Sequence, residues 1–254
     1  MKQQILQQFF IDLAEPKTLE KHVFCTGTPS NDARPWAKNN GTLILYDNRL
    51  LCRTDDESLT QKLQETYDDC PAEWFGEISN LKHLECLLNQ YDYTMVDYGP
   101  FFIPQKIESF DSSSYRFYTD DEIHQFQGKE AFEECFMFDP QHPDLLGISL
   151  ERDGKTIAMV GMNQTGKYCL ELGIQVLPEF QHQEIATQLV KAMAYEAQQR
   201  YPDKVLTYGT QFTHSQSINV AIKSGFIHSW TEIVLSKKVS NCISMNKKYS
   251  ERIA

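Results

Sequence analysis

The apolar and polar positions in the first half of the chain predict alternating helices and strands. Residues 1–16 place an apolar stripe on one helix face, made of Ile5, Leu6, Phe9, Phe10 and Leu13. GTLILYDNRLLCR (residues 41–53) predicts two strands around a tight turn at Asp47-Asn48. Further along, we expect a helix over 55–67, a helix over 81–91, and a strand over 91–104 that ends at Gly99-Pro100.

The second half is more regular. It predicts the order helix, strand, strand, strand, helix, strand, helix, strand. The expected elements are a helix over 119–138 capped by Thr119 or Asp120, a hairpin over 145–163 turning at Arg152-Asp153-Gly154, a strand over 168–178, a helix beginning near Ile185, a strand over 204–212, a short helix over 214–226 that Gly225 stops in a left-handed conformation, and a strand over 228–238.

A polar, serine-rich stretch, SFDSSSYRF (residues 109–117), separates the two halves. We therefore expect a smaller N-terminal α/β domain over residues 1–113 and a second domain over residues 114–254. The fold class expected for the whole chain is α/β, or α+β.

Composition and charge exclude several classes of function. The 254 residues are 41% hydrophobic and 23% charged, which is ordinary for a globular protein. The net charge is −11, and apart from the short stretches SKK (residues 236–238) and NKK (residues 246–248) there is no lysine and arginine patch, so nucleic acid is not expected as a partner. No apolar run is long enough to span a bilayer, and the N-terminus lacks the features of a secretory signal, so we expect no membrane contact and a cytoplasmic location.

The seven cysteines include no C-x-x-C pair, and the seven histidines form no metal-binding pattern. Unpaired thiols in a reducing compartment are therefore expected, with no metal site.

The stretch VLPEFQHQEIATQLV (residues 176–190) predicts the end of a strand, a loop containing a proline, and the start of a helix. The first amide groups of a helix lack partners within the helix and attract anions, so such a turn suits a phosphate. The central part, QHQEIAT (residues 181–187), nevertheless contains no glycine, lysine or arginine, and it carries Glu184.

Together with the order of elements, ELGIQVLPEFQHQEIATQLV and HSQSINVAIKSGF resemble the GNAT superfamily of acyl-CoA-dependent N-acetyltransferases over roughly residues 115–238. The resemblance implies a mixed, mostly antiparallel sheet flanked by helices. It also implies acetyl-CoA as co-substrate and an amine, on a small molecule or a protein, as acceptor. The first half resembles the additional N-terminal domain of some bacterial two-domain members.

The resemblance also implies positions for the coenzyme. The strand before the loop would splay from its neighbour and pair with the pantetheine arm through Ile174, Gln175 and Val176. The loop and helix start would hold the diphosphate through Gln181, His182, Gln183, Glu184, Ile185, Ala186 and Thr187. The start of the last helix would add His214, in place of the usual asparagine, and Ser217.

Glu184 departs from the family pattern because it occupies a position that is usually glycine. If its carboxylate points at the diphosphate, repulsion weakens coenzyme binding; two like charges 4 Å apart cost about 1 kcal/mol in water. If it faces water, an acid in the first turn stabilises the helix by roughly 0.3–1 kcal/mol. The sequence leaves both alternatives open.

Two residues are candidates for proton transfer. Glu171 is the candidate base, since a glutamate on this strand often deprotonates the amine in the family; the alternative is that it lies on the solvent face with Gly173 and Gln175. The tyrosine that often protonates the leaving thiolate is replaced by Ala221. Tyr208 can take over that role only if its side chain points into the cleft.

The sequence therefore predicts an N-acetyltransferase in which the amine attacks acetyl-CoA directly. The alternative is a binding or regulatory module of the same fold that has lost turnover, as Glu184, His214 and Ala221 indicate. The acceptor and the oligomeric state are not predicted.

Overall fold

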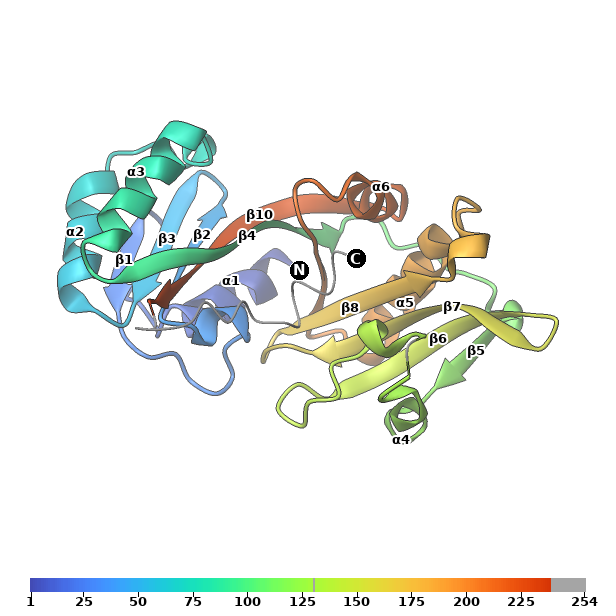
Figure 1. The fold of residues 1–254 in the computed structure, drawn as a ribbon. Helices are drawn as coiled ribbons and strands as arrows, with labels where there is room; N and C mark the ends of the chain where they lie inside the picture. The colour runs from blue at the N-terminus through green and yellow to red at the C-terminus, as the bar shows by residue number, and fades with distance from the viewer. Residues whose placement is uncertain (130, 239–254) are drawn as a thin grey trace.

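The computed structural model describes residues 1–129 and 131–238 of the chain, so Cys242 and the basic stretch Asn246–Lys248 lie outside the described residues. The described strands form one ten-stranded sheet in the order β1-β3-β2-β10-β4-β9-β8-β7-β6-β5 (Figure 1). The strands are β1 (Val23–Thr26), β2 (Gly41–Tyr46), β3 (Arg49–Thr54), β4 (Tyr93–Pro104), β5 (Tyr115–Tyr118), β6 (Asp144–Arg152), β7 (Lys155–Gln164), β8 (Cys169–Val176), β9 (Val205–Gly209) and β10 (Phe226–Lys237).

Six α-helices accompany the sheet in the described residues: α1 (Lys2–Asp12), α2 (Glu57–Tyr67), α3 (Ile78–Asn89), α4 (Asp120–Ile123), α5 (Ile185–Arg200) and α6 (Ser215–Lys223). Most neighbouring strands in this part of the chain are antiparallel, and among the described strands only the pairs β1–β3 and β8–β9 are parallel. This confirms the predicted class, a mixed and mostly antiparallel sheet flanked by helices. No helix in the described residues is long and apolar enough to cross a membrane.

Local sequence patterns predicted several elements correctly. Both predicted hairpins form, and their turn residues Asp47, Asn48, Asp153 and Gly154 all have positive φ, as two-residue turns of this kind require. Gly225 follows α6 with φ +86° and confirms the predicted left-handed end. The edge strands β1 and β5 were not predicted, because four residues are too few for a clear alternation.

The N-terminal helix buries a slightly different face from the one predicted. Ile5, Phe9 and Leu13 are fully buried as expected, but Phe10 is 38% exposed and Ile11 is buried instead. Ile11 packs against a small cluster with Ala33, which lies beside the helix although it is distant in sequence. The stripe is therefore shifted by a long-range contact that helical periodicity does not reveal.

The prediction that β4 ends at Gly99-Pro100 is wrong, because the strand continues to Pro104. The carbonyl of Pro100 points toward β9. It accepts a hydrogen bond, at 3.3 Å, from the N–H of Thr210, the residue that follows β9. Its missing donor points to the same side, away from β10. The ladder between β4 and β10 therefore loses no hydrogen bond at this proline.

The prediction of one helix over residues 119–138 is also wrong. Thr119 caps α4 with a capping box to Glu122, as expected for a helix start, but α4 ends at Ile123. Two 3₁₀ turns, η4 (His124–Phe126) and η5 (Glu133–Cys135), follow, and Gly128 and Phe132 have positive φ. Burial of the aromatic side chains in this segment against the sheet overrides its helical pattern.

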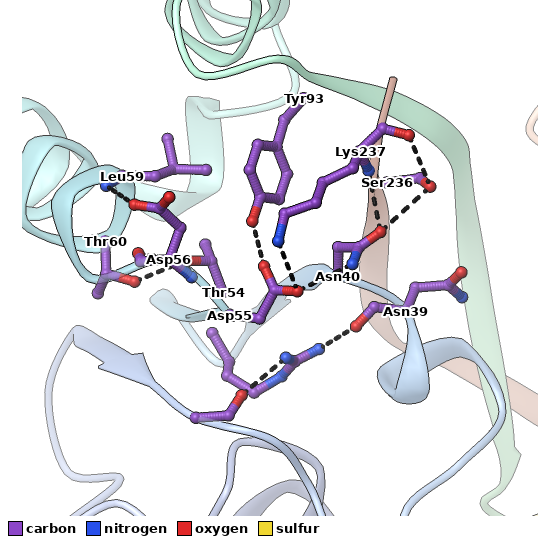
Figure 2. Close-up of polar contacts among 12 residues, drawn as sticks. Asn39, Asn40, Thr54, Asp55, Asp56, Leu59, Thr60, Tyr93, Ser236 and Lys237 are labelled. Atoms are coloured by element: carbon purple, nitrogen blue, oxygen red, sulfur yellow. Dashed lines mark hydrogen bonds and ion pairs between the residues drawn. The ribbon is translucent and has the colours of Figure 1, made fainter. Parts of the chain in front are cut away.

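The last strand in the described residues, β10, joins the two halves because it lies between β2 and β4. A polar cluster fixes its far end, where Asp55 lies between Tyr93 and Lys237 (Figure 2). Asn40 accepts from Lys237 N–H at 2.9 Å. The boundary predicted near residue 113 stays a prediction, and the sheet runs continuously across it.

Candidate functional site

The strands β8 and β9 separate in the middle of the sheet. They pair only from Cys169 with Val205 to Glu171 with Thr207, whereas β8 continues along β7 to Val176. Among the described residues, no strand pairs with the other edge of β8 beyond Glu171. The sheet therefore opens at this point, as the resemblance implied.

The main-chain groups that face the opening can be identified by alternation. Val205 N–H donates to Tyr168 O at 2.9 Å, and Thr207 Oγ1 donates to Leu170 O at 2.7 Å, so even-numbered residues of β8 face β9. Ile174 and Val176 therefore direct their N–H and C=O groups into the opening, and Gln175 directs its own toward β7.

The side chains near the end of β8 hold the surrounding loops. Gln175 Oε1 accepts from Phe132 N–H at 2.8 Å, which attaches the segment before η5 to the sheet. Gln181 Nε2 donates to Val176 O at 3.3 Å, within the opening. Gln175 thus contributes a side-chain contact to the loop, and its predicted contact with the coenzyme stays a prediction.

The loop between β8 and α5 presents a row of main-chain donors. After the 3₁₀ turn η6 (Pro178–Phe180), His182 and Glu184 have φ of +60° and +61°, and α5 begins at Ile185. No described residue accepts a hydrogen bond from the N–H groups of residues 182–187. Such unpartnered donors at a helix start match the needs of a diphosphate.

The carboxylate of Glu184 lies at the surface beside α6. The side chain is 70% exposed, forms no cap to its own helix, and places Oε1 3.7 Å from Lys223 Nζ. Of the two alternatives for Glu184, this arrangement favours the carboxylate that faces water. Its backbone nevertheless has the left-handed conformation that suits glycine, which costs about 1–2 kcal/mol for other residues.

We expect Glu184→Gly to raise the free energy of unfolding by up to about 1 kcal/mol, because relief of the left-handed strain exceeds the entropy that glycine loses on folding. Denaturant titration measures this change. Glu184→Ala is the matched control, since it removes the charge and keeps the Cβ atom. An equal gain for both variants would show that charge, rather than backbone strain, is responsible.

The candidate base, Glu171, is half-buried at the last position of β8 that pairs with β9. Its cross-strand neighbours are Asn163 on β7 and Thr207 on β9, both buried. A methyl group at Gly209 would lie 3.3 Å from Glu171 Oε1, so the carboxylate extends over β9. Glu171 therefore lies beside the opening, between the parts of this face covered by α1 and η5.

The candidate acid, Tyr208, lies on the opposite face of the sheet from Glu171. Its side chain is buried in the core beneath α5 and α6, and its hydroxyl lies 2.9 Å from Ser217 Oγ. Burial raises the pKa of the Tyr208 hydroxyl above its ordinary value, so the group keeps its proton. Tyr208 follows Thr207, the last residue of β9 that pairs with β8, and its role as acid stays a prediction.

The remaining predicted positions flank α6. His214 is exposed, precedes the helix, and makes no side-chain cap. Ser217 attaches the first turn of α6 to β9 through Tyr208. Ala221, where the family often has tyrosine, is fully buried against the core.

Three residues beside the opening were not predicted as part of the site: Gly173, Gly209 and Phe101. An isolated glycine in a strand indicates a close backbone approach, so Gly173 carried a usable signal. Phe101 lies on β4 and reaches the site because β4 pairs with β9 at Gly209 and Tyr208. No spacing within the second half of the chain reveals that contact.

The second half of the chain matches a known family model. Residues 107–226 match the family model described as the acetyltransferase (GNAT) family, whereas no curated protein matches the chain. Similar solved structures include a GNAT-family acetyltransferase from Colwellia psychrerythraea, with 14% identity over 74% of this chain and 78% of that one and a TM-score of 0.43. A GCN5-related N-acetyltransferase-like protein from Streptococcus suis has 10% identity over 92% and 99%, with a TM-score of 0.45.

The matched segment contains the separating strands, the loop with its row of donors, and both helices that flank the opening. The segment that resembles the GNAT acetyltransferase family is therefore the one that forms the opening.

Proposed function

We propose that the protein is an N-acetyltransferase that moves the acetyl group of acetyl-CoA to an amine by direct attack. The observation that carries the proposal is the end of β8–β9 pairing at Glu171 and Thr207, next to the unpartnered N–H groups of residues 182–187. The first feature offers main-chain partners to an extended arm, and the second offers donors to a diphosphate.

The coenzyme would then occupy the opening from the side of α5 and α6. Its diphosphate would accept hydrogen bonds from the loop, where the exposed Glu184 carboxylate lies beside Lys223. The pantetheine arm would pair with the main chain of Ile174 and Val176. It would thereby take the place that a neighbouring strand would occupy on the open edge of β8. The Gln181 side chain, which donates to Val176 O, would move away so that this carbonyl can accept a hydrogen bond from the arm. A side-chain amide moves more readily than a strand.

The chemistry requires an uncharged amine and a stabilised oxyanion. Glu171 would accept a proton from the ammonium group, which leaves a lone pair on nitrogen for attack on the thioester carbon. As the C–N bond forms, main-chain donors on the splayed strand would stabilise the negative oxygen. The C–S bond then breaks, and the second proton that the nitrogen loses as the amide forms passes to the departing thiolate, through Tyr208 or through water.

Calorimetric titration with acetyl-CoA, combined with a thiol-release assay on a panel of amines, tests the proposal. We expect micromolar binding and amine-dependent release of one thiol per acetyl group transferred. Binding without release would instead support the alternative, a module of this fold without turnover, which the buried Ala221 in place of a tyrosine favours. Absence of binding at millimolar coenzyme would overturn both.

A further inference from the structure

The two most exposed large apolar side chains in the described residues lie at one turn of the N-terminal half. Ile78 is 71% exposed and Trp74 is 63% exposed. Trp74 ends the 3₁₀ turn η2 (Ala72–Trp74), and Ile78 begins α3. Between them, Phe75 is fully buried with its ring against Tyr67. The turn is therefore anchored to the core by one aromatic ring while it presents another to solvent.

The apolar surface continues from this turn toward the loop that follows β9. A methyl group at Gly76 would lie 2.5 Å from the Tyr98 hydroxyl, so Tyr98 lies directly beside the turn. The ring of Tyr98 packs against the exposed ring of Phe212, with centroids 4.8 Å apart. We call Trp74, Ile78, Tyr98 and Phe212 the Trp74 patch. Single apolar side chains are ordinary at a surface, whereas a continuous group of them marks an interaction surface.

The surroundings of the Trp74 patch are acidic. Residues 65–77 contain no lysine or arginine and five carboxylates, those of Glu65, Asp68, Asp69, Glu73 and Glu77. Of these five, only Glu65 forms an ion pair in the part of the chain that the structure describes, with Lys62. Glu73 and Glu77, which precede and follow Trp74, are exposed. The next cation along the chain is Lys82, one helical turn beyond Ile78.

Elsewhere the chain covers its own aromatic rings with cations. The cation lies 4.9–5.7 Å from the ring centroid in four such pairs, Arg49 with Tyr46, Arg116 with Tyr118, Arg152 with Phe180, and Lys237 with Tyr93. An indole attracts a cation more strongly than a phenyl or phenol ring does. No lysine or arginine in the described residues lies over Trp74, however. Trp74 and its two flanking carboxylates thus suit a cation that the described chain does not supply.

We propose that the Trp74 patch binds a segment of another protein in which an arginine stands beside aliphatic side chains. The planar guanidinium would stack on the indole of Trp74, and its N–H groups, which lie in its own plane, would donate to Glu73 and Glu77. The aliphatic neighbours of the arginine would cover Ile78 and Phe212. A lysine carries its charge at one point, so it cannot stack on the ring and reach both carboxylates at once.

Charge decides between this occupant and the others that an apolar patch can take. An anionic membrane surface would be repelled by the carboxylates around Trp74. A second copy of the chain, related by a two-fold axis, would bring the same patch and the same carboxylates face to face. A cationic protein segment is the occupant that complements the patch. The inference does not depend on acetyl transfer, and it gives the N-terminal half a role in binding.

Fluorescence anisotropy with the dye-labelled peptide acetyl-LRALRAL-amide tests the proposal on the full chain. The matched peptide acetyl-LKALKAL-amide carries the same charge, so it controls for general attraction to an acidic protein. We expect the arginine peptide to bind at least about twofold more tightly than the lysine peptide, the low end of a cation–π contribution. Trp74→Ala should weaken binding of the arginine peptide by about 2–30-fold. Phe10→Ala, at an exposed ring on α1, is the matched control and should leave the Kd unchanged.

The double variant Glu73→Gln and Glu77→Gln tests the carboxylates separately from the ring. It should weaken binding of the arginine peptide by about 2–30-fold, as expected for two exposed ion pairs. Absence of binding at millimolar peptide, equal Kd values for the two peptides, or an unchanged Kd in Trp74→Ala would overturn the proposal. Sedimentation velocity and flotation with phosphatidylserine vesicles examine the other occupants. A dimer or a vesicle-bound form that Trp74→Ala abolishes would also overturn it.

Discussion

Glu171→Gln is expected to lower kcat for a strongly basic alkylamine by about 100-fold or more, the usual contribution of a general base. The amide has almost the same shape as the carboxylate but cannot take a proton from the ammonium group. Because Glu171 lies on the face opposite α5 and α6, the Kd for acetyl-CoA should not change. Steady-state kinetics and calorimetry on the same preparation measure the two quantities.

A weakly basic acceptor separates a role in proton transfer from a role in structure. Hydroxylamine is uncharged at pH 7 and needs no base, so its rate should fall much less in the Glu171→Gln variant. Glu65→Gln, an exposed substitution on α2, serves as the matched control for the change itself. Equal losses with both acceptors would contradict the assignment of Glu171 as base.

The sequence predicted those parts of the site that local chemistry determines. The strand, loop and helix from Cys169 to Arg200 were expected in the right order, and the opening of β8 from β9 agrees with the resemblance. The turn residues and the helix cap at Thr119 were also predicted correctly, because they depend on conformation and hydrogen bonds within a few residues of the chain.

The parts that were missed depend on contacts between distant segments. Residues 126–138 have a helical pattern, yet their aromatic rings pack against the sheet, and Gly161 leaves room for Cys135 O and the ring of Phe136. Likewise, β4 reaches the site because it pairs with β9, a strand about 100 residues later in the chain. In both cases, packing between segments that are distant in sequence determines the structure, and the local sequence pattern does not reveal it.

Glu184 shows a third kind of limit. Its sequence position indicated a conflict with a diphosphate, but only the structure shows where the carboxylate lies and that the backbone keeps a glycine-like φ of +61°. The shape of the loop is therefore retained although the residue that suits it best is absent. Conformation at this turn is specified by the flanking strand and helix more than by the residue itself.

The buried ion cluster that joins the two halves gives the largest expected effect on stability. Arg34 Nε lies 2.6 Å from Asp12 Oδ2, and Nη1 lies 2.8 Å from Glu232 Oε2, with all three side chains at most 2% exposed. Burial alone would lower the pKa of Arg34, but the two carboxylates outweigh it and raise the pKa, so the guanidinium stays charged. The cluster links the end of α1 to β10.

Arg34→Met is therefore expected to lower the free energy of unfolding by about 3–5 kcal/mol, because it leaves two carboxylates buried without their cation. Denaturant titration followed by circular dichroism measures the loss. Arg116→Met is the matched control, since its ion pair with Glu151 is at the surface and worth at most about 1 kcal/mol. Adding Glu232→Gln to Arg34→Met should recover part of the loss by removing one uncompensated charge. A cost for Arg34→Met no larger than that of the control would show that the cluster does not hold the two halves together.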